Sequence, residues 1–136
     1  MGPFNQQDGR AAANAMARFL VVLKPREPLP AAALIEGLSP LMHQLEAEVD
    51  HRTTAHLSAL LRGGEDALRL QLFADVQARP GGSLLELLLM SREAMGRGAP
   101  QTRRRFEQLV ELAAQVMPGL DLVFRSDRDG PMPSIA

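Results

Sequence analysis

The side chains of this chain that come nearest to a metal-binding pattern are its three histidines and the carboxylates among them. His43 precedes Glu46 by three residues and Asp50 by seven, so the three share one face if the segment is helical. The segment also has the Glu-x-x-His spacing of di-iron helical bundles, ending at His51, but the sequence lacks the second copy that such a site needs. We predict no metal site and no cofactor. A metal-dependent helical enzyme centred on His43, Glu46, Asp50 and His51 remains an alternative.

Three consecutive arginines, Arg103, Arg104 and Arg105, form a second charged group. Pro100 is expected to begin a helix, which places them in its first turn, where the helix dipole disfavours positive charge. An ion pair to Glu107 would compensate in part, and an acidic protein surface or a phosphate backbone would compensate more fully. A nucleic-acid-binding regulator that uses these arginines is therefore an alternative function. The net charge of −1 gives no global attraction to nucleic acid, so a protein partner is favoured.

The composition argues against catalysis and against a membrane protein. The chain has no cysteine and no tyrosine, and it contains no Gly-x-Ser-x-Gly motif, so we predict that it is not an enzyme. Its longest apolar runs fall far short of the roughly 20 residues that a membrane span needs. The absence of cysteine suits a reducing compartment, and we expect a cytoplasmic protein. A single lysine against fourteen arginines is typical of a GC-rich bacterial genome.

The most informative segment runs from Leu84 to Met90 and is apolar at every position except Glu86. Ser83 and Glu86 have the spacing of a capping box, which predicts a helix that ends near residues 96–98. A helix that is apolar almost all round is buried in a core or in an interface, and methionine-rich helical surfaces adapt to partner grooves. We predict that a protein partner or a second copy contacts Leu84, Leu87, Leu88, Met90 and Met95.

Periodicity and helix-breaking residues predict the remaining elements. Apolar residues at helical spacing, bounded by proline or glycine, predict helices over residues 8–23, 31–36, 39–63 and 100–117. Residues 67–77 fit either a helix or a half-buried strand, because leucines alternate there with polar residues.

These elements predict an all-α domain, a small bundle of four to five helices packed around the helix that begins at Leu84. A single domain is expected over residues 8–124, with a flexible segment 1–7 and a disordered tail 125–136. The alternative is an α+β fold with a small sheet from strands at 19–23, 68–73 and 120–124. The predicted function is a non-catalytic protein–protein interaction module, an adaptor, accessory or regulatory protein that forms a homodimer or binds another protein.

Overall fold

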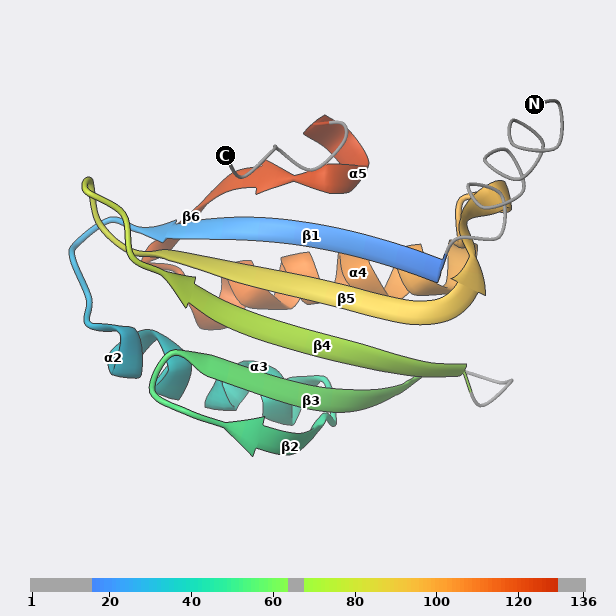
Figure 1. Ribbon diagram of the computed structural model, residues 1–136, viewed down its shortest axis with the longest axis horizontal. Coiled ribbons are helices and arrows are strands. Elements are labelled where there is room, and N and C mark those ends of the chain that lie inside the picture. Colours follow the sequence, from blue (N-terminus) through green and yellow to red (C-terminus); the bar gives the residue numbers. More distant parts are fainter. Residues whose placement is uncertain (1–15, 64–67, 130–136) are drawn as a thin grey trace, which may run out of the picture.

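The protein folds around a six-stranded antiparallel sheet, with strand order β2-β3-β4-β5-β1-β6 and its main helices on one face (Figure 1). This is seen in a computed structural model, which describes residues 16–63 and 68–129. The prediction of an all-α helical bundle is therefore wrong.

Two helices follow the first strand, four strands then come in succession, and a long helix precedes the last strand. The strands are β1 (Met16–Pro25), β2 (Glu48–Arg52), β3 (His56–Gly63), β4 (Leu68–Gln77), β5 (Leu84–Ala94) and β6 (Leu120–Arg125). The helices are α2 (Ala31–Glu36), α3 (Ser39–Gln44), α4 (Pro100–Val116) and α5 (Ser126–Asp129), with a 3-10 turn, η1 (Met95–Arg97), between β5 and α4. None of the described helices is long and apolar enough to cross a membrane.

The segment predicted as the central helix is strand β5, which lies between β4 and β1. Its odd-numbered leucines, Leu85, Leu87 and Leu89, are fully buried against the helices. The even-numbered residues, such as Leu84 and Leu88, lie on the opposite face and are half-buried. Because both faces of this strand are apolar, the sequence loses the alternation that marks a half-buried strand, and an apolar run does not distinguish helix from strand.

The long helix predicted over residues 39–63 is also wrong, because helix α3 stops at Gln44 and strands β2 and β3 follow. Glu46 has a φ of 53°, a left-handed conformation in which a helix cannot continue. Leu57 and Leu61 are buried on the same side of β3. Their spacing of four residues suits a helix face, but it is also a multiple of the two-residue period of a strand.

Of the other predicted elements, two helices are confirmed and the remaining segments differ from the prediction in part. The helices predicted at 31–36 and 100–117 are confirmed as α2 and α4. Of the predicted helix 8–23, residues 16–23 belong to β1 and the remainder lies outside the described residues, as do residues 1–7 and 130–136. The segments 19–23, 68–73 and 120–124 of the α+β alternative lie in β1, β4 and β6, within a sheet of six strands rather than three. In the tail predicted to be disordered, residues 126–129 form α5.

One face of the sheet and the helices share a single core. The ring of Phe106 on α4 stacks on that of Phe19 on β1, with centroids 5.4 Å apart. Both residues are buried, together with the inward-facing side chains of β3, β4 and β5. The helices contribute Ile35 from α2, Leu41 and Met42 from α3, and Leu109 and Ala113 from α4.

Candidate binding face

The face of the sheet turned away from α2, α3 and α4, here called the open face, carries none of these three helices (Figure 1). Successive side chains along a strand point to opposite faces of the sheet. When one residue points into the core, the residues before and after it therefore lie on the open face. The open face consists of Arg18, Leu20, Val22 and Lys24 from β1, His56, Ser58, Leu60 and Arg62 from β3, Arg69, Gln71, Phe73, Asp75 and Gln77 from β4, and Leu84, Glu86, Leu88, Met90 and Arg92 from β5.

The centre of the open face is apolar. Phe73 lies opposite Leu88, which in turn lies opposite Leu20, so three apolar side chains form a row across three strands. Leu20 is buried, whereas Phe73 and Leu88 are half-buried and form the accessible part of the row. Phe73 and Met90 also line a hollow of about 720 Å³, with the side chain of Leu60 at its side. Half-buried apolar groups around a hollow provide a surface on which another side chain can pack.

One end of the open face is acidic. Asp75 lies directly opposite Glu86, and the Nδ1 atom of His56 is 2.7 Å from the Asp75 Oδ1 atom. Burial raises the pKa of Glu86, the positive charge of Arg79 lowers it, and the nearby Asp75 carboxylate raises it further, with a net increase. The Glu86 carboxylate is therefore partly dehydrated, whereas the Asp75 side chain is 43% exposed and contacts His56.

The other end of the open face is basic. Arg62 on β3 lies directly opposite Arg69 on β4. Arg92 follows the residue paired with Leu70, which places it beside Arg69 on the neighbouring strand. Arg69 and Arg92 both line the hollow next to Met90. The open face therefore has an apolar centre between an end with three arginines and an end where Asp75 and Glu86 lie together with His56 and Lys24.

The five residues predicted to contact a partner do not share one surface. Leu84, Leu88 and Met90 lie on the open face, where they are half-buried. Leu87 is fully buried in the core, and Met95 in the η1 turn packs partly against that core. Three of the five thus remain candidates for contact, and the other two serve the packing of the fold.

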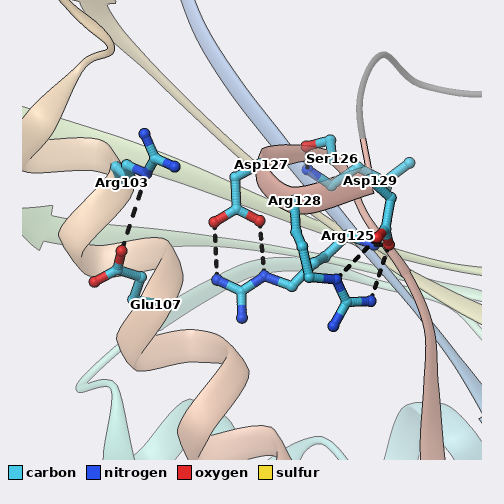
Figure 2. A network of polar contacts seen from close by, with 8 residues as sticks. Arg103, Glu107, Arg125, Ser126, Asp127, Arg128 and Asp129 are labelled. Carbon is cyan, nitrogen blue, oxygen red and sulfur yellow. Dashed lines mark hydrogen bonds and ion pairs between the residues drawn. The ribbon is translucent and has the colours of Figure 1, made fainter.

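The three consecutive arginines diverge from one another. Arg103 is 3.9 Å from Glu107 on the side of α4 that faces α5, where Asp127 holds Arg125 in a bidentate ion pair (Figure 2). Arg105 instead donates hydrogen bonds to Gln108 and to a backbone carbonyl of β3. We see no continuous basic patch in this part of the described chain.

Glu93 explains how the first turn of α4 tolerates these arginines. The Glu93 carboxylate accepts hydrogen bonds from the backbone amides of Gln101 and Thr102, at 3.1 and 2.7 Å, and from the Thr102 hydroxyl at 2.7 Å. Burial would raise the pKa of Glu93, but these bonds and the charge of Arg104 lower it below its ordinary value. A carboxylate from β5 thus caps the positive end of the helix dipole.

The histidines and carboxylates that were considered as metal ligands lie on different elements of the fold. His43 lies on α3, whereas Asp50 and His51 lie on β2, so they do not share one helix face. Asp50 accepts a hydrogen bond of 2.6 Å from the Ser58 hydroxyl. Among residues 16–63 and 68–129, no group of three or more metal-ligating side chains is close enough to hold an ion.

Sequence reasoning missed the charged ends of the open face. The alternation in residues 68–77 was the available signal, since it puts Arg69, Phe73 and Asp75 on one face of a strand. The position of Asp75 beside Glu86 depends on the pairing of two strands, which the sequence alone does not provide.

Comparison of the chain with protein-family models, with curated proteins and with solved structures gave no significant match.

Proposed function

We propose that this protein is a non-catalytic binding module that contacts another protein chain through its open face. The observation that carries the proposal is the apolar row of Phe73, Leu88 and Leu20 on the side of the sheet away from α2, α3 and α4. Apolar groups surrounded by polar residues on a broad surface are typical of protein interaction sites. We expect it to act in the cytoplasm, as the absence of cysteine suggests.

A protein ligand suits this face better than nucleic acid does. The open face carries arginines at one end and carboxylates at the other, whereas a phosphate backbone requires a surface of one sign. The divergence of Arg103 and Arg105 removes the reason to favour nucleic acid at α4. We do not favour the metal-dependent enzyme either, because the helix that was expected to align His43 with Asp50 does not exist.

The test replaces one apolar side chain in the centre of the face. Leu88→Asp places a charge in the apolar row, while Leu29→Asp makes the same change at a residue that is 42% exposed on the connector after β1. We expect complexes of the wild-type chain, isolated after chemical cross-linking, to persist in Leu29→Asp and to be lost in Leu88→Asp. Circular dichroism checks that both variants fold. Retention of the complexes by a folded Leu88→Asp variant would show that the open face is not the binding surface.

A further inference from the structure

The two central strands present the same order of side chains along the open face, although they run in opposite directions. Each begins with an arginine at the basic end, continues with two uncharged residues, and reaches a carboxylate at the acidic end. The series are Arg69, Gln71, Phe73 and Asp75 on β4, and Arg92, Met90, Leu88 and Glu86 on β5. The midpoints of the two series are Leu72 and Leu89, which are themselves directly paired.

This order places like charges together within one copy of the chain. Asp75 lies directly opposite Glu86, and Arg62 lies directly opposite Arg69. Like charges directly opposite each other destabilise a pair of strands. A surface that brought the opposite charge to each end would relieve both unfavourable pairs at once.

We propose that a second copy of this chain covers the open face, in a two-fold symmetric dimer that places the basic end of each copy over the acidic end of the other. The symmetry axis would lie in the interface, perpendicular to the strands, over the Leu72–Leu89 pair. A rotation of 180° about it puts Arg69 over Asp75 of the partner subunit and Arg92 over Glu86 of the partner subunit. The inference rests on the proposed function, since it names the occupant of the same face.

The same rotation matches the apolar centre with itself. It puts Phe73 of the partner subunit over Gln71, and Leu88 of the partner subunit over Met90, both of which line the hollow. Stacked sheets lie about 10 Å apart, a separation that long arginine side chains can span. The contact is isologous, so it closes at two copies and leaves no open face for a third.

Charge reversal at Arg92 and Glu86 tests this arrangement in the full chain. Arg92→Glu and Glu86→Arg should each weaken self-association by roughly tenfold or more, because each brings like charges together across the interface. The Glu86→Arg, Arg92→Glu double variant should dimerise again, and an equimolar mixture of the two single variants should form a heterodimer. Arg104→Glu makes the same reversal on the exposed surface of α4 and should leave dimerisation unchanged. Self-association is measured by sedimentation in the analytical ultracentrifuge. Because the chain has no tryptophan or tyrosine and absorbs little at 280 nm, the protein is detected by interference optics.

The outcomes separate this proposal from the one on which it rests. A wild-type chain that remains monomeric at all concentrations overturns the dimer, as does a mixture of the single variants that fails to associate. If Leu88→Asp nevertheless abolishes cross-linked complexes with another protein, the open face is a binding surface with a different occupant. If Leu88→Asp has no effect on any complex, both proposals fail together.

Discussion

At the scale of single residues, Glu93 is the side chain on which the start of α4 most depends. The residue before this helix, Ala99, has a φ of 45° and offers no side-chain cap. The first amides are satisfied instead by a carboxylate from the preceding strand, on the other side of the η1 turn. Glu93 thus connects the end of β5 to the only long helix among the described residues.

We predict that Glu93→Gln lowers the free energy of unfolding by about 1–2 kcal/mol at neutral pH, as the loss of a charged helix cap does. The pKa of Glu93 is lowered in the folded state, so its stabilising effect is fully present above the ordinary carboxyl value of 4.5. The effect is lost as the pH falls through the lowered value. Denaturant unfolding between pH 7 and pH 3 measures the free energy of unfolding and its dependence on pH. The difference in this free energy between wild type and variant should become smaller as the pH falls.

The control is Glu111→Gln, at an exposed position farther along the same helix, which should change stability by less than about 0.5 kcal/mol. A Glu93→Gln variant as stable as this control at pH 7 would contradict the capping role.

At the scale of elements, the two faces of β5 divide its apolar residues between folding and contact. Leu87 and Leu88 are adjacent in the chain, but one is fully buried among the helices and the other is half-buried on the open face. Since the strand period is two residues, a shift by one position would exchange these environments.

We therefore predict that Leu87→Ala costs about 2–5 kcal/mol of stability, because it leaves a cavity in the packed core. Leu88→Ala should cost about 1 kcal/mol, since its side chain faces away from that core. Chemical denaturation of both variants in dilute solution gives the comparison. Equal losses, or a larger loss for Leu88→Ala, would contradict the register of β5.

The elements that could be predicted from sequence are those with local signals. Helix α4 begins at Pro100, repeats its apolar residues every three or four positions and stops before Pro118, so all its evidence lies within the segment. Strands β3 and β5 lack such evidence, because leucines four residues apart or in continuous runs satisfy both periods. The candidate site followed the same rule. Leu88 could be selected from composition, whereas the pairing of Asp75 with Glu86 arises from contacts between strands.

At the scale of the whole molecule, the edges of the sheet are less available for association than its open face. The edge strand β2 is exposed throughout and rich in charge, and a register shift interrupts its pairing with β3. At the other edge, the pairing of β1 with β6 is also shifted, and the Leu20 amide donates a hydrogen bond of 2.9 Å to the Ser126 hydroxyl. Charges and bulges at edges oppose strand addition, so contact through the face is favoured.

The most direct measurement is thiol labelling of two single-cysteine variants, which the natural absence of cysteine makes possible. Gln71→Cys places the thiol in the centre of the open face, and Gln115→Cys places it on the exposed surface of α4. We predict that labelling of Gln71→Cys slows several-fold as the protein concentration rises or a partner is added, while the rate for Gln115→Cys stays constant. Binding through the open face would be contradicted if only Gln115→Cys were labelled more slowly. It would also be contradicted if the labelling rate of Gln71→Cys stayed the same while the protein was bound to a second copy or to a partner.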